Sequence, residues 1–139
     1  MFAHVSLLGV LLSALSAMVI GTIWYHQAVF GKRWMKAIGL TEAVMKERAN
    51  AALGMLVIVS LVTAYALSLV TRYLHEYTGD SGVKVGVEAA LLVGIGFGVT
   101  TILAHGVFEP RDKDVLYINL GNRLVTLLAM GLIIGAFIK

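Results

Sequence analysis

The chain has 139 residues, the size of one domain, of which 59% are apolar and only 14% are charged. Soluble domains carry about 45–50% apolar and about 25% charged residues. Together with a mean hydropathy of +0.89, this composition excludes a soluble enzyme, a disordered chain and a secreted disulfide scaffold. The chain has no cysteine, which excludes thiol chemistry, and its net charge of +3 comes from basic residues beside apolar segments. We therefore expect a lipid bilayer, and no nucleic acid, as its partner.

Four apolar segments are long enough to cross a membrane as helices, which takes about 20 residues each. They cover residues 5–25, 51–71, 85–105 and 115–138. None contains proline, because Pro110 lies in the loop before the fourth segment. No Lys or Arg precedes the first segment, so we expect it to be retained as a span and not cleaved as a signal peptide. The prediction is an all-α integral membrane four-helix bundle, one domain over residues 1–139 built from two transmembrane hairpins.

The first loop has the composition of a surface helix. Its segment 31–39 mixes Lys and Arg with Trp, Met and Ile, as in a helix that lies in the membrane interface with its cations toward lipid phosphates. Gly39 is expected to end this interfacial helix. Thr41 then caps the next helix, with Glu42 in its first turn, and that helix is expected to continue into the second span.

The basic residues of the loops predict the orientation of the chain. The first and third loops together hold seven of them, namely Lys32, Arg33, Lys36, Lys46, Arg48, Arg111 and Lys113. The opposite side holds three, namely Arg72, Lys84 and Lys139. Because Lys and Arg are in excess on the cytoplasmic side of membrane proteins, we expect both loops in the cytoplasm and both termini outside.

Small residues at four-residue spacing predict where the spans pack, because helices in a bilayer associate through close contact of small side chains. The first span carries Gly9, Ser13, Ala17 and Gly21, and the third carries Gly86, Ala90, Gly94 and Gly98. These rows either let the four helices touch within one chain or form a subunit interface. Since a bundle this small has a limited interior, we expect a homo-oligomer.

Arg123 lies near the middle of the fourth span, where an ionisable residue is costly and is a candidate for function. It shares a helical face with Asn119, Asn122 and Thr126. The candidate ligand-binding residues at this depth are Arg123, Asn119, Asn122, Glu109, His105, His26 and Tyr25. Two interpretations remain open: a structural clasp in which Arg123 pairs with Glu109, or a pocket for a ligand or ion.

The histidines allow a further hypothesis. His4 and His75 fall on the outer side and His26 and His105 on the inner side, the pairing that a di-haem bundle needs. A non-haem metal held by His26, His105 and Glu109 is the other form of this hypothesis. All four histidines lie at span ends, whereas axial ligands lie deeper, so we expect no cofactor and no metal.

Two observations on acidic residues bear on a transport function. Glu88, near the outer end of the third span, is either an interfacial acid or a proton-coupling group, and we favour the first. The first span has no acidic residue. A small multidrug exporter of similar size would carry its essential carboxylate there, so its absence argues against that class of protein.

Two blocks of sequence resemble a known family. The first consists of Gly21–Tyr25, Val29–Lys36 and Gly39–Glu42, and the second of Phe108–Glu109, Tyr117–Gly121 and Leu124–Val125. Both resemble the domain of unknown function 1761 family of small four-helix prokaryotic membrane proteins, over nearly the whole chain. The resemblance implies the fold and an inner-membrane location, and it brings no activity. The family pattern tends to have Tyr-His where this chain has Asn122-Arg123.

The expected function is that of an integral membrane protein without enzymatic activity, either structural or accessory, or binding a small ligand. The first alternative is a small transporter or channel for an anion or polar solute that uses an Arg123-centred pocket. The second alternative is a redox protein that holds haem or a metal through its histidines.

Overall fold

The computed structural model describes residues 5–108 and 112–138, and over these ranges the chain is helical without any strand. The all-α prediction is therefore confirmed. His4, Glu109, Pro110, Arg111 and Lys139 lie outside the described residues. The helices are α1 (Leu7–Trp24), α2 (Lys32–Ile38), α3 (Glu42–Thr78), α4 (Gly82–Val93), α5 (Thr100–Phe108) and α6 (Lys113–Ala136). Two short stretches of wider π-helical turns, η1 (Gln27–Gly31) and η2 (Gly94–Val99), precede α2 and α5.

Four helical runs are long and apolar enough to cross a membrane, which confirms the four predicted segments as helices. They are Leu7–Trp24, Glu42–Thr78, Gly82–Gly106 and Lys113–Ala136. The third runs continuously through α4, η2 and α5. The helix α3 has 37 residues, so it extends beyond the predicted apolar segment 51–71 at both ends, from Glu42 to Thr78. At 1.5 Å per residue it is about 55 Å long, more than the hydrocarbon thickness of a bilayer.

Local signals explain where these helices begin and end. The predicted cap is confirmed, since the Thr41 hydroxyl accepts a hydrogen bond from the Val44 amide at 3.5 Å and α3 starts at Glu42. Gly39 ends α2 with a φ of 70°, in the left-handed region that glycine adopts without strain, and Gly79 ends α3 in the same way. The predicted helix in the first loop therefore exists as α2.

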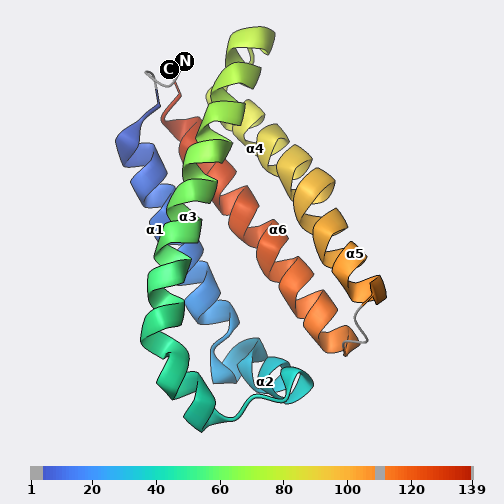
Figure 1. The fold of residues 1–139 in the computed structure, drawn as a ribbon. Coiled ribbons are helices and arrows are strands. Elements are labelled where there is room, and N and C mark those ends of the chain that lie inside the picture. The colour runs from blue at the N-terminus through green and yellow to red at the C-terminus, as the bar shows by residue number, and fades with distance from the viewer. Residues whose placement is uncertain (1–4, 109–111, 139) are drawn as a thin grey trace.

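α6 lies at the centre of the arrangement and contacts α1, α3, α4, α5 and α2. In Figure 1 it runs between α1 on one side and the α4–α5 run on the other. One end of the molecule, the termini end, holds the start of α1, the end of α6 and the turn between α3 and α4. The other end, the α2 end, holds α2, the end of α5 and the start of α6.

The buried apolar cluster belongs mostly to the termini half of the molecule. It consists of Val10, Ala14, Ala64, Leu67, Ala89, Ala90, Leu127, Met130 and Ile134. Large apolar side chains are exposed on the outer faces of all four long runs, for example Leu7, Ile58, Phe97 and Leu132. Soluble monomers rarely expose so much contiguous apolar surface. The outside of these helices therefore has the character of a surface that faces hydrocarbon.

The row of small residues on α1 packs only in part. A Cβ on Gly9 would lie 3.2 Å from Cβ of Phe137, and the Ser13 hydroxyl donates a hydrogen bond to the Met130 carbonyl oxygen at 3.3 Å. Ala17 is packed against the buried cluster. Gly21, in contrast, has no atom within 4 Å of the place where a Cβ would lie. The first three members therefore approach other parts of the chain, and Gly21 faces open space.

The second row of small residues, on α4 and η2, determines how α4–α5 and α6 diverge. A Cβ on Gly86 would collide with the Gly131 carbonyl oxygen, and one on Gly82 with that of Gly135, so only glycine fits at this crossing. Further along, a Cβ on Gly94 would lie 3.3 Å from Leu127 Cδ1, and a Cβ on Gly98 would lie 3.2 Å from Arg123 Cγ. The residues of α6 that face this row therefore become larger toward the α2 end, from glycine to leucine to arginine. Their side chains hold the two helices further apart there.

Candidate functional site

Further toward the α2 end, α5 and α6 enclose a groove of about 410 Å³. It is lined by Thr101, Ile102, His105 and Gly106 of α5 and by Lys113, Val115, Leu116 and Asn119 of α6. Small-molecule sites are typically about 300–1,000 Å³, with apolar walls and a few polar groups. The groove has that size and that mixture, and no acidic residue is among those that line it in the described part of the chain.

Asn119 presents a hydrogen-bond donor to this groove. Its Oδ1 accepts two hydrogen bonds, from the Tyr25 hydroxyl at 2.9 Å and from the Trp34 Nε1 at 3.1 Å. An indole N–H can only donate, so this arrangement fixes which end of the amide is the oxygen. The Nδ2 group must then point away from the two aromatic rings. No described residue accepts a hydrogen bond from it, and Asn119 lines the groove.

A tight reversal after α1 brings these aromatic donors to α6. Gly31 closes the π-helical turns of η1, where a Cβ would collide with the Tyr25 carbonyl oxygen, so glycine is required. The Tyr25 and Trp34 rings then meet edge to face with centroids 5.1 Å apart. Trp24 donates from Nε1 to the Ile118 carbonyl oxygen at 3.0 Å. The reversal therefore anchors the end of α1 to the turn of α6 that carries Asn119.

An ion pair fixes the next segment of chain to α6. The Arg33 guanidinium binds both carboxylate oxygens of Asp114, at 2.8 and 3.2 Å. This two-point contact holds α2 against the first turn of α6. It also engages the charge of Asp114, which is next to Lys113 at the mouth of the groove. The sequence had suggested neither Trp34 nor Arg33 as part of the site.

Arg123 is not among the residues that line the groove. It lies one helical turn beyond Asn119 on α6, and its Cγ and Nε lie 3.2 and 3.5 Å from where a Cβ of Gly98 would be. The side chain therefore crosses over η2, and glycine at residue 98 gives it room. No ion pair of Arg123 occurs within residues 5–108 and 112–138. Glu109, the predicted partner of Arg123, lies outside the described residues.

The two inner histidines have different surroundings. His105 lines the groove, and its Nδ1 lies 2.8 Å from the Thr101 carbonyl oxygen. A carbonyl can only accept, so Nδ1 carries the proton, which leaves Nε2 of a neutral ring as an acceptor. His26 does not line the groove, since it is exposed and its Nδ1 accepts from the Ala28 amide at 3.2 Å to begin η1. In the described part of the chain, no three His, Asp or Glu residues could hold a metal together.

The predicted polar face of α6 divides in two. Asn119 lines the groove, whereas Arg123 lies against Gly98 of η2. Asn122 Nδ2 and Thr126 Oγ1 are instead buried, and the described residues offer them no hydrogen-bond partner. Both lie on α6 between Ile118 and Met130, whose carbonyl oxygens accept hydrogen bonds from Trp24 and Ser13 of α1. The structure thus brings together Asn119, its partner Tyr25 and His105 at the groove. It places Arg123 one helical turn further along α6, and it leaves Asn122 and His26 elsewhere.

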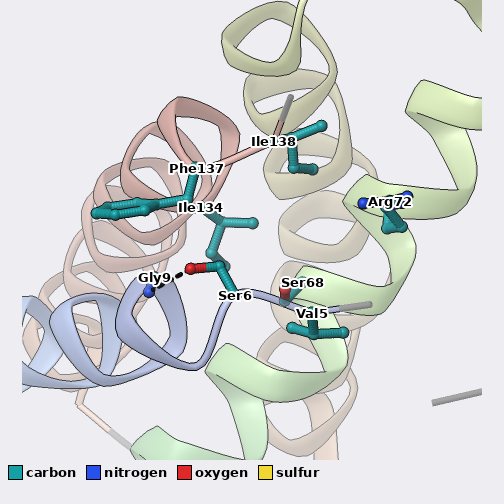
Figure 2. Close-up of a pocket in the computed structure, with 8 residues that line it drawn as sticks. All are labelled: Val5, Ser6, Gly9, Ser68, Arg72, Ile134, Phe137 and Ile138. Atoms are coloured by element: carbon teal, nitrogen blue, oxygen red, sulfur yellow. Dashed lines mark hydrogen bonds between the residues drawn. The ribbon is translucent and has the colours of Figure 1, made fainter. Parts of the chain in front are cut away.

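A second, much smaller pocket lies at the termini end. It is lined by Val5, Ser6, Gly9, Ser68, Arg72, Ile134, Phe137 and Ile138, as Figure 2 shows. In the same view the Ser6 hydroxyl accepts from the Gly9 amide at 3.2 Å, which caps α1. The pocket holds only about 10 Å³, which is at the lower limit for a single water molecule. It is too small for a ligand.

Residues 8–135, which include both walls of the groove, match the model of a family described as "Protein of unknown function (DUF1761)". The chain belongs to this family. The resemblance of its Trp-Tyr and Phe-Gly-Lys blocks is thereby confirmed. No curated protein and no solved structure matches the chain. Since membership of this family brings no activity, a function has to be argued from the groove.

Proposed function

We propose that this chain is an inner-membrane four-span bundle that binds a small polar or anionic ligand in the groove between α5 and α6. The observation that carries the proposal is the amide of Asn119. Tyr25 and Trp34 saturate its oxygen, and its nitrogen is thereby presented to the groove. Arg123 supplies a positive charge one helical turn further along α6 than Asn119. Neither residue has a catalytic role in this proposal.

The membrane location is supported by the four long apolar runs and by their exposed apolar outer faces. In the proposed orientation the α2 end is cytoplasmic, because it carries the excess of Lys and Arg, and both termini are outside. α2 then lies in the inner interface, with Lys32 and Lys36 exposed. A reporter fused after Lys139 is expected to be active only outside the cytoplasm, and activity inside would reverse the orientation.

Binding fits this geometry better than permeation does. A channel needs a path through both halves of the molecule, whereas α4 and α6 approach backbone to backbone at Gly86 and Gly131. The groove lies at one end only. We also propose a homo-oligomer, because one chain of this size leaves much of its apolar surface exposed. Crosslinking of the protein in its native membrane tests this, and a monomer only would contradict it.

Titration of the purified protein with inorganic phosphate tests ligand binding, with tryptophan fluorescence as the readout, because Trp34 is bonded to Asn119. Hydrogen bonds to charged groups contribute about 1.5–3 kcal/mol, so Arg123→Gln is expected to weaken binding roughly tenfold or more. Arg123→Lys keeps the charge and is expected to bind with an intermediate affinity. The matched control is Lys84→Gln, which removes an exposed cation at the termini end.

The outcomes separate a binding site from a structural clasp. A saturable response that Arg123→Gln weakens, while unfolding temperatures stay similar, supports the proposal. If no variant changes the response, or if no anion gives one, the binding proposal is wrong. Should Arg123→Gln fail to accumulate, the Arg123→Lys titration still decides, because a clasp alone predicts no phosphate response in either protein.

A further inference from the structure

The walls of the α5–α6 groove are more apolar than a soluble anion requires. Ile102, Val115 and Leu116 line the groove together with Lys113 and Asn119. A small hydrated ion gains nothing from such side chains, whereas a hydrocarbon chain gains about 25 cal/mol for each Å² that it buries. The groove therefore suits a ligand with an apolar part as well as an anionic one.

The polar groups are arranged along one line. On α6, Asn119 is six residues beyond Lys113, which is about 9 Å along the axis. Going inward, a ligand meets a cation, then the Nδ2 donor, with an apolar wall alongside. A phospholipid has the complementary order, with a phosphate outermost, an ester carbonyl next and an acyl chain innermost.

The groove is open to the surroundings of the helices. Among the described elements the main neighbours of α5 are η2 and α6. Figure 1 shows it at the edge of the molecule, away from α1 and α3. A ligand can therefore enter the groove sideways, and its acyl chain can leave the groove by the same side.

Charge favours an anion at the mouth. Asp114, the acid next to Lys113, is bound by Arg33 at 2.8 Å. Asp112 accepts from the Asp114 amide and caps α6. The ammonium of Lys113 has no ion pair within the described residues, so it is available to a phosphate.

From these observations, and resting on the proposed function, we infer that the groove binds an anionic phospholipid of the adjacent leaflet. Lys113 binds the phosphate, Asn119 Nδ2 donates to an ester carbonyl, and Ile102 and Leu116 hold the first part of an acyl chain. His105 also lines the groove, and it contacts the Thr101 carbonyl oxygen through Nδ1 and not through Nε2. A free phosphate has the same anionic chemistry, so the experiment separates the two sources.

The test uses the full chain in detergent micelles and phospholipids that carry bromine on an acyl chain, because bromine quenches indole fluorescence at short range. Trp24 and Trp34 are both bonded to the turn of α6 next to the groove. Brominated phosphatidylglycerol is expected to quench saturably at a lower mole fraction than brominated phosphatidylcholine. A basic residue near a lipid surface contributes a binding energy equivalent to about fivefold, so Lys113→Gln is expected to weaken the phosphatidylglycerol affinity by about that factor.

A second variant tests the groove itself. Gly106 lines it, and a Cβ added there would lie 3.3 Å from Leu116 Cδ1, so Gly106→Leu fills the space and is expected to abolish saturable quenching by both lipids. The controls are Lys84→Gln at the termini end and Gly96→Leu, because no atom lies within 4 Å of a Cβ at Gly96. Both are expected to behave like the wild type.

The remaining outcomes overturn the inference in distinguishable ways. Equal quenching by the two lipids, or quenching that Gly106→Leu leaves unchanged, means that the lipid only surrounds the helices. If inorganic phosphate gives an Arg123-dependent response and no lipid quenches saturably, the ligand is a soluble anion and only the lipid inference fails. If neither probe binds, the proposed function fails with it.

Discussion

The two halves of this molecule hold the same helices together by different means. In the termini half, glycines let the backbones of α4 and α6 touch, and all the buried residues of α3 lie between Ala64 and Thr71. In the α2 half, no residue of α3 before Ala64 is buried, and the contacts of α6 include hydrogen bonds from Trp24, Tyr25 and Trp34 and the ion pair with Arg33. Close packing fixes one half, and directional polar contacts shape the other.

The difference has a physical consequence. A contact between two glycine backbones cannot adjust to a larger side chain, because neither side has atoms that can move aside. Hydrogen bonds from long side chains can lengthen, break or exchange with water. We therefore expect substitutions in the termini half to affect global stability, and substitutions in the α2 half to act on the position of α2 and on the groove.

The largest effect is expected for Gly86→Leu. A Cβ at residue 86 already collides with the Gly131 carbonyl oxygen, so α4 and α6 must separate along the whole crossing. Overpacking typically costs about 1–3 kcal/mol, and contact with backbone places this variant at the upper end. Thermal unfolding in detergent measures the loss. Gly96→Leu, with open space around it, serves as the control. Equal unfolding temperatures for the two variants would mean that the glycine crossing does not stabilise the protein.

An intermediate effect is expected for Asn119→Leu. The substitution removes the acceptor of two donors, the Tyr25 hydroxyl and the Trp34 indole N–H. An unsatisfied buried donor costs about 1–3 kcal/mol, but these contacts are only partly buried, so water can replace part of this loss. We expect faster trypsin cleavage after Arg33 and a red-shifted tryptophan emission, with a smaller change in unfolding temperature than for Gly86→Leu. Tyr25→Phe removes one donor only and is expected to give a smaller change than Asn119→Leu.

Much of the fold was predictable because it depends on local sequence. The apolar segments, the Thr41 cap and the glycine that ends α2 each act within a few residues of themselves. The apolar segment 51–71 does not indicate where α3 ends, because charged residues after Thr71 lower the hydropathy without ending a helix. Only the left-handed Gly79 ends it.

The site was less predictable, because it depends on how helices cross. Helical spacing places Asn119 and Asn122 on one broad face, but α1 lies against part of that face and separates the two amides. Trp34 reaches Asn119 only because the turn at Gly31 reverses the chain. A signal for it was present, since a tryptophan at a membrane interface needs an acceptor for its indole N–H. The acceptor itself is 85 residues away along the chain, and no local pattern names it.

The smallest effect is expected for Arg33→Gln, which sharpens the contrast within the α2 half. The Arg33 and Asp114 side chains are 63% and 39% exposed, and exposed ion pairs contribute about 0–1 kcal/mol. The variant is expected to increase trypsin cleavage in the first loop slightly at low salt and not at high salt, where the wild-type pair is already screened. Cleavage after Lys36 is the readout, because it is a site that both proteins keep. If Arg33→Gln releases α2 as fully as Asn119→Leu does, then the ion pair, and not the buried Asn119 contact, holds the α2 end together.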